Sequence, residues 1–150
     1  MYNRTPKGSQ WRKWDCHIHT PASILNHHFG NNWDNYVSQL FKKAIEHNIA
    51  SIGITDYFSI EGYTILKRDY LDNEAKLKDL FVDIEIEQIR NILIFPNIEF
   101  RIDKLVANNG FNDKWNRKVN FHLLLSDDIA LEDIQNNLIQ NIKFETLEQP

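Results

Sequence analysis

Residues 11–20 read WRKWDCHIHT, and the fold that we expect starts from this short segment. Its second half alternates side chains with the period of two that a β-strand has. On that period Asp15, His17 and His19 share one face of the strand. Pro21 then ends the strand, because proline cannot donate a hydrogen bond to a neighbouring strand. The segment therefore predicts a strand that carries two histidines into a site.

The rest of the chain alternates between helical and extended patterns. Apolar residues at helical spacing predict helices over residues 33–47, 61–72, 74–90 and 129–142, and mostly apolar runs predict strands over 49–55, 92–102 and 119–125. A polar loop, 107–117, lies between the last two strands. This order favours an α/β fold with about four parallel strands and crossover helices. In such folds the site lies at the carboxyl ends of the strands.

Composition and charge indicate an acidic globular domain. Apolar residues make up 42% of the 150 residues, and 17 Lys and Arg stand against 21 Asp and Glu, a net charge of −4. A pI near 5.8 excludes a general nucleic-acid binder, which would be basic overall. Cys16 is the single cysteine, so the chain cannot form an internal disulfide. The start of the chain is unlike a signal peptide, and no apolar run approaches the ~20 residues of a membrane span. We expect a cytoplasmic protein without a membrane partner, with residues 1–10 as a flexible leader to a domain over 11–150.

Imidazoles and carboxylates stand at the ends of all four predicted strands. His17 and His19 end the first strand, Asp56 the second, Glu99 the third and His122 the fourth. These groups are ligands of zinc, manganese and iron. A His-x-His pair suits one ion between its imidazoles, and a carboxylate such as that of Glu99 can bridge two ions. Two metal ions ~3.5–4 Å apart are a common arrangement for phosphoester hydrolysis.

Three of these residues also have an ordinary structural interpretation. Asp56 could cap the helix that follows it. Glu99 could be a solvated residue at the edge of the sheet, and His122, in an apolar strand, could be a core histidine. The combination is therefore stronger evidence for a metal site than any single member.

Four other reactive side chains are given no role in the site. His27 and His28 lie in a polar loop and are expected to be surface residues. His47 ends a predicted helix, where an imidazole meets the helix dipole. Cys16 faces away from the histidines on strand geometry, so we expect neither a nucleophile nor a metal ligand there.

Four segments resemble, in order, the first motifs of the PHP (polymerase and histidinol phosphatase) domain family. They are DCHIHT at 15–20, GITDY at 53–57, FPNIEF at 95–100 and NFHLLL at 120–125. More narrowly, GSQWRKWDCHIHTPAS at 8–23 and GITDYFSIEGY at 53–63 are similar to the N-terminal domain of TrlF-type proteins, in which a PHP domain precedes a large ATPase region. The resemblance spans about residues 8 to 142.

The resemblance implies a distorted (β/α)7 barrel with metal ions at its carboxyl-terminal mouth. It places His17 and His19 on a first ion, Glu99 between the first and second ions, and His122 on the second. Asp56 would support the site from beside it, so Asp56 and Glu99 are the implied catalytic residues. The cofactors would be two divalent ions, Zn, Mn or Fe.

The sequence departs from the family pattern at three places. Tyr57 and Leu25 stand where the family has histidines that bind a third ion. The family also has a late histidine and an Asp-x-His pair, whereas this sequence has no histidine after His122. Four strands make a partial barrel, so we expect either the N-terminal part of a truncated PHP-like domain or a shortened relative that a partner chain completes.

The function expected from these features is that of a metal-dependent phosphoesterase. A metal-bound hydroxide would attack a phosphoester, with a nucleotide or a nucleic-acid end as substrate, and the activity is expected of the full-length protein. The alternative is a non-catalytic PHP-like module that binds a partner or regulates an ATPase-containing protein. An amidohydrolase-type enzyme, which also begins with His-x-His on its first strand, is a third reading.

Overall fold

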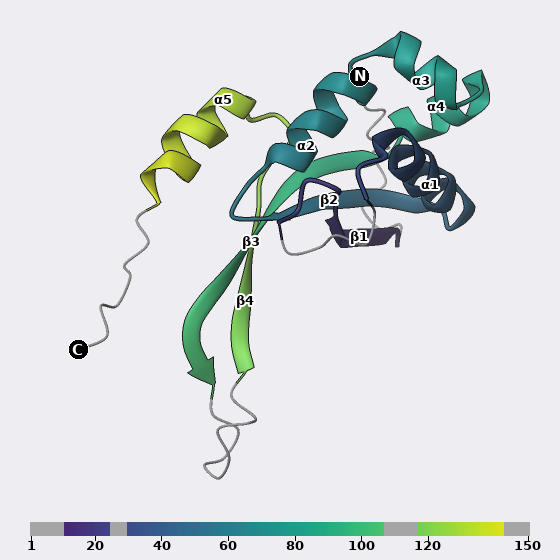
Figure 1. Ribbon diagram of the computed structural model, residues 1–150. Helices are drawn as coiled ribbons and strands as arrows, with labels where there is room; N and C mark the ends of the chain where they lie inside the picture. Colours follow the sequence, from purple (N-terminus) through teal and green to yellow (C-terminus); the bar gives the residue numbers. More distant parts are fainter. Residues whose placement is uncertain (1–10, 25–29, 107–116, 143–150) are drawn as a thin grey trace.

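A computed structural model describes residues 11–24, 30–106 and 117–142. The predicted leader, 1–10, lies outside these residues. The fold is α/β, with four strands in the order β1-β2-β3-β4. The strands are β1 (Lys13–His19), β2 (Ile49–Tyr57), β3 (Leu93–Val106) and β4 (Arg117–Leu124). They form a curled sheet that resembles half of a barrel (Figure 1).

The strands run in two directions. β1 and β2 pair in parallel, as do β2 and β3, but β4 is antiparallel to β3. The prediction of four parallel strands is therefore wrong for the fourth. Only residues 107–116 separate β3 from β4. Antiparallel neighbours can be joined by so short a connection, whereas parallel neighbours need a crossover of about a dozen residues or more. The two strands form long arms that project from the rest of the sheet (Figure 1).

Helices follow the strands in the predicted places, but they are more divided than expected. The helical elements are α1 (Trp33–Glu46), α2 (Glu61–Ile65), its π-helical continuation η1 (Leu66–Leu71), α3 (Glu74–Leu80), α4 (Asp83–Arg90), and a last helical segment of α5 (Leu131–Asp133), η3 (Ile134–Leu138) and η4 (Ile139–Asn141). None of the described helices has the length and apolar character to cross a membrane.

The predicted helix over 74–90 is two helices because the chain turns at Phe81. The backbone of Phe81 is extended (φ −138°, ψ 150°), which ends α3. Its side chain is buried and packs edge-on against Phe41 of α1, with ring centroids 6.0 Å apart. The carboxylate of Glu85 then accepts a hydrogen bond from the backbone N–H of Val82 at the start of α4. Burial of an aromatic ring thus overrides the helical pattern here.

The main core lies between the helices and one face of the sheet. Ile52 and Ile54 of β2 and Ile94 of β3 are almost fully buried and belong to the same cluster as Val37 and Phe41 of α1. Figure 1 shows α1, α2, α3 and α4 on the same side of the strands. We call the opposite side, on which none of these four helices lies, the helix-free face. Because side chains alternate along a strand, the residues between the core isoleucines point to that face.

An extra residue in β1 changes which side chains share a face. Asp15 pairs with Ile52 and Ile18 with Ile54, so three steps along β1 match two along β2. This is a β-bulge. As a result Asp15 and Ile18 line the same pocket, between β1 and α1. The prediction that Asp15 shares a face with the two histidines is wrong, because it assumed an unbroken period of two.

Two residues, one on β2 and one on β3, accommodate the bulge. The carbonyl oxygen of Cys16 accepts a hydrogen bond from Asn97 Nδ2 at 2.7 Å. It also lies so close to Gly53 that a Cβ atom there would be 2.5 Å from it. The bulge therefore requires glycine at position 53, and it leaves the two histidines on the helix-free face.

Candidate metal centre

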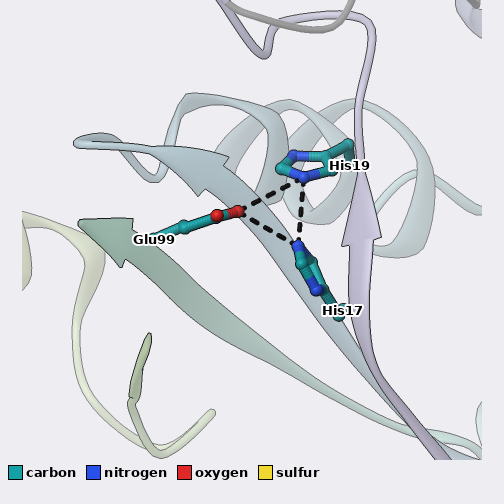
Figure 2. A group of neighbouring side chains, drawn as sticks. All are labelled: His17, His19 and Glu99. Carbon is teal, nitrogen blue, oxygen red and sulfur yellow. Dashed lines mark hydrogen bonds and ion pairs between the residues drawn. The ribbon is translucent and has the colours of Figure 1, made fainter. Parts of the chain in front are cut away.

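Three side chains converge on the helix-free face (Figure 2). His17 and His19 extend from β1, and Glu99 reaches toward them from β3. The Nε2 atom of His17 lies 3.0 Å from Oε2 of Glu99, and Nε2 of His19 lies 3.3 Å from the same oxygen. The two Nε2 atoms are 3.1 Å apart. The three ligand atoms thus form a nearly equilateral triangle.

The size of this triangle fits one divalent ion. Zinc binds histidine nitrogen and carboxylate oxygen at about 2.0–2.2 Å, so neighbouring ligand atoms on one ion lie about 2.8–3.6 Å apart for angles at the metal between about 90° and 110°. The observed separations of 3.0 to 3.3 Å fall within that range. Two imidazoles and a carboxylate are also a donor set that zinc, manganese and iron accept. His17, His19 and Glu99 could therefore hold a metal ion.

Glu99 is the buried member of the group. Its side chain is 1% exposed, and in register it lies between Tyr57 of β2 and His122 of β4. Both carboxylate oxygens are engaged: Oε2 faces the two imidazoles, and Oε1 accepts a hydrogen bond from Asn120 Nδ2. A buried carboxylate is costly unless it is paired or coordinates a cation. The position therefore suits a metal ligand better than the solvated edge residue that was the alternative.

His19 is held both through its ring and through its backbone. Its Nδ1 lies 3.2 Å from the hydroxyl of Ser23, a buried residue, so Nε2 is the nitrogen that faces Glu99. Tyr36 donates a hydrogen bond to the carbonyl of His19 at 3.0 Å. Burial lowers the pKa of His19, while the charge of Glu99 acts in the opposite direction. The neutral imidazole that burial favours is the form that binds metals.

His17 is the accessible member. Its side chain is 50% exposed, and its ring lies edge-on to the rings of His19 and His122, at centroid distances of 4.9 and 4.5 Å. The group therefore opens to solvent on the side of His17.

His122 lies next to the three converging ligands without joining them. Its Nδ1 is 3.1 Å from Nδ2 of Asn97 and 3.3 Å from Oδ1 of the same amide. Among the described residues, the set whose ligand atoms all lie within 4.8 Å of one another contains only His17, His19 and Glu99. The structure thus brings His122 against His17 but gives it a different hydrogen-bond partner.

Asp56 lies on the other face of the sheet. Its carboxylate is buried and accepts hydrogen bonds from Thr20 Oγ1 and from the backbone N–H of Gly62, both at 2.7 Å. Burial raises the pKa of this carboxyl, although both donors favour the charged form. Because Gly62 is in the first turn of α2, these contacts match the capping role that was the alternative for Asp56. The structure does not bring Asp56 together with the three converging ligands.

The remaining histidines and the cysteine add no ligand. His27 and His28 lie outside the described residues. His47 is at the carboxyl end of α1, as predicted. Burial and the charge of Asp15 raise the pKa of the Cys16 thiol, which disfavours the thiolate that a nucleophile or a ligand needs.

Sequence analysis missed the residues that hold the ligands in place. Ser23, Asn97 and Asn120 each contact a predicted site residue through a side-chain hydrogen bond. Serine and asparagine are common in loops and at strand ends, so their types carry no signal of their own. Only their positions inside the quoted segments TPAS, FPNIEF and NFHLLL could have drawn attention to them.

Comparisons with known proteins add no relative. No family model, no curated protein and no solved structure matches this chain.

Proposed function

We propose that the protein is a metal-dependent phosphoesterase of the PHP type, with His17, His19 and Glu99 as metal ligands. The observation that supports this is the convergence of two imidazole nitrogens and one buried carboxylate oxygen within 3.0 to 3.3 Å of one another. The ordered sequence motifs support the family and the half-barrel sheet is compatible with a partial (β/α)7 barrel. A bound divalent ion would supply a Lewis acid that activates water and stabilises negative charge on the phosphoryl group.

In this proposal the protein's own side chains would hold the metal ligands in position and leave room for the substrate. Ser23 fixes the ring of His19, and Asn120 holds the second oxygen of Glu99. His17, at the exposed side of the site, leaves an approach for the substrate. For a second ion, we propose His122 as the additional ligand, with Glu99 as the bridge, because the two residues are paired across β3 and β4.

The substrate class that we propose is a phosphoester of a nucleotide or nucleic-acid end. Its support is the resemblance to TrlF-type proteins. The same resemblance supports an ATPase region, or a partner chain, as the part that would complete the partial barrel. The net charge of −4 gives no support to a nucleic-acid substrate. The non-catalytic module is the second candidate, and it is favoured by the fact that the described residues bring together ligands for a single ion.

Hydrolysis by a Glu99→Gln variant tests the proposal. We expect the wild-type chain with Mn²⁺ to release nitrophenol from p-nitrophenyl phosphate, and the variant to be at least ~100-fold slower because it lacks the anionic ligand. Glu87→Gln, an exposed residue of α4, is the matched control and should keep full activity. Turnover that survives in Glu99→Gln would contradict the proposal. Bound metal without any turnover by the wild-type chain would favour the non-catalytic module.

Ser23→Ala tests the hydrogen bond behind His19. Because this hydroxyl orients the imidazole, its loss is expected to weaken Zn²⁺ affinity by about 10-fold. Competition with a chelating dye measures the change. Ser51→Ala is the control, since Ser51 is equally buried but donates to the carbonyl of Leu93, away from the ligands. Equal Zn²⁺ affinity in Ser23→Ala and the wild type would show that Ser23 does not orient His19.

A further inference from the structure

A column of three side chains on the helix-free face begins at the proposed metal ligand His19. The ring of Tyr57 stacks on the ring of His19, with centroids 5.0 Å apart and an interplanar angle of 21°. Tyr57 also lies under the guanidinium of Arg101, whose Cζ is 5.4 Å from the ring centroid. The three residues come from β1, β2 and β3, so the column crosses the sheet beside the converging ligands.

Arg101 is placed near the metal ligands by the register of β3. It lies two residues beyond Glu99 on the same face, about 7 Å along the strand, which is within reach of an arginine side chain. It is exposed, and in register its neighbour on β4 is Asn120. Within the described part of the chain Arg101 forms no ion pair, and its observed contact is with the aromatic face of Tyr57. Contact with an aromatic face leaves the guanidinium N–H donors free to bind an anion.

We propose that Arg101 and Tyr57 form an anion subsite that binds the phosphate group of a phosphomonoester. This inference rests on the proposed function. Arg101 would donate two parallel hydrogen bonds to phosphate oxygens, and Tyr57 would be a positioning residue that holds the guanidinium over its ring. A guanidinium next to a divalent cation favours a dianion over a monoanion, so the subsite selects a terminal phosphate over a phosphodiester.

Orthophosphate binding to the manganese-loaded chain tests the subsite by calorimetry. We expect Arg101→Ala to weaken orthophosphate affinity by about 10-fold or more, and Arg101→Lys to recover part of the loss, because lysine keeps the charge but not the fork. Manganese content should be unchanged in both. The control is Arg68→Ala, an exposed arginine of η1 that pairs with Asp69. Unchanged affinity in Arg101→Ala, or no orthophosphate binding by the wild-type chain, would overturn the inference.

Variants of Tyr57 test whether its aromatic ring positions the guanidinium of Arg101. Tyr57→Phe keeps the aromatic face and should bind orthophosphate like the wild type, whereas Tyr57→Leu should bind it several-fold more weakly, with manganese content unchanged. Equal affinity in Tyr57→Phe and Tyr57→Leu would remove Tyr57 from the subsite.

Hydrolysis assays distinguish failure of this inference from failure of the proposed function. Arg101→Ala should raise KM for p-nitrophenyl phosphate more than for bis(p-nitrophenyl) phosphate, with a smaller effect on kcat. An equal effect on the two substrates would overturn the selection of monoesters. If the wild-type chain hydrolyses neither compound but binds orthophosphate through Arg101, the proposed function fails and the anion subsite stands.

Discussion

A variant with both His17 and His19 replaced by alanine is expected to lose its metal. In the wild-type chain two imidazole nitrogens and one carboxylate oxygen face one another, and the double substitution leaves only the carboxylate of Glu99. One carboxylate cannot compete with water for a transition metal at micromolar concentration, so affinity for Zn²⁺ or Mn²⁺ should fall by more than ~100-fold. Elemental analysis after gel filtration measures the bound metal directly.

The control for this experiment is another histidine of the same chain. His47 lies at the carboxyl end of α1, away from the converging ligands, and His47→Ala should retain the metal content of the wild type. One equivalent per chain would match the three ligands that converge, and two equivalents would support His122 as a further ligand. Metal that persists in the double variant at the wild-type level would contradict the centre.

The closeness of His17 and His19 could be predicted because their geometry is local. His17 and His19 are separated by one residue, and the strand period alone places them on one face. Glu99 and His122 were expected near the site as residues at the carboxyl ends of parallel strands, but Glu99 lies within β3 and His122 within the antiparallel β4. Register then brought Glu99 opposite His122 even though β4 runs the other way.

The failures arose where distant residues decide the outcome. The bulge in β1 depends on the absence of a side chain at Gly53 and on the amide of Asn97, and neither is close to Asp15 in sequence. The direction of β4 does have a signal in the sequence, because the segment before it, 107–117, has no helical pattern and is too short for a crossover. The division of the helix at Phe81 depends on Phe41, forty residues earlier.

Asp56→Ala is expected to destabilise the fold rather than to change the chemistry directly. The carboxylate of Asp56 is the acceptor for two buried donors, the hydroxyl of Thr20 and the N–H of Gly62, at 2.7 Å each. Its removal leaves both donors without a partner, and an unsatisfied buried donor costs about 1–3 kcal/mol. We therefore expect the free energy of unfolding in urea to fall by about 3 kcal/mol. Asp56→Asn, which keeps one acceptor, should lose less.

The contribution of Asp56 to the free energy of unfolding should decrease as the pH rises. Burial raises the pKa of Asp56 above its ordinary value of 3.8, so the folded chain holds this proton more tightly than the unfolded chain. The stabilising contribution of Asp56 is therefore greatest at low pH and decreases as the pH rises through the folded-state pKa. The side chain of Asp56→Asn does not titrate. The difference between the unfolding free energies of this variant and the wild type should therefore change between the ordinary pKa of 3.8 and the raised pKa of the folded state. A difference that does not vary with pH would contradict the assigned burial.

Gly62→Ala tests the same contact from the other partner. A Cβ atom at position 62 would overlap Thr20 and the carboxylate of Asp56, so the substitution should destabilise the chain by about 2–3 kcal/mol. Gly30→Ala is its control: no atom lies within 4 Å of the added methyl group, and the cost, about 1 kcal/mol, comes from the positive φ of 59° alone.

If Asp56→Ala instead unfolds like the wild type and still abolishes hydrolysis with metal bound, Asp56 acts on the reaction, as the PHP resemblance implies. Loss of stability with less than ~10-fold change in metal affinity would assign it to the junction between β1, β2 and α2.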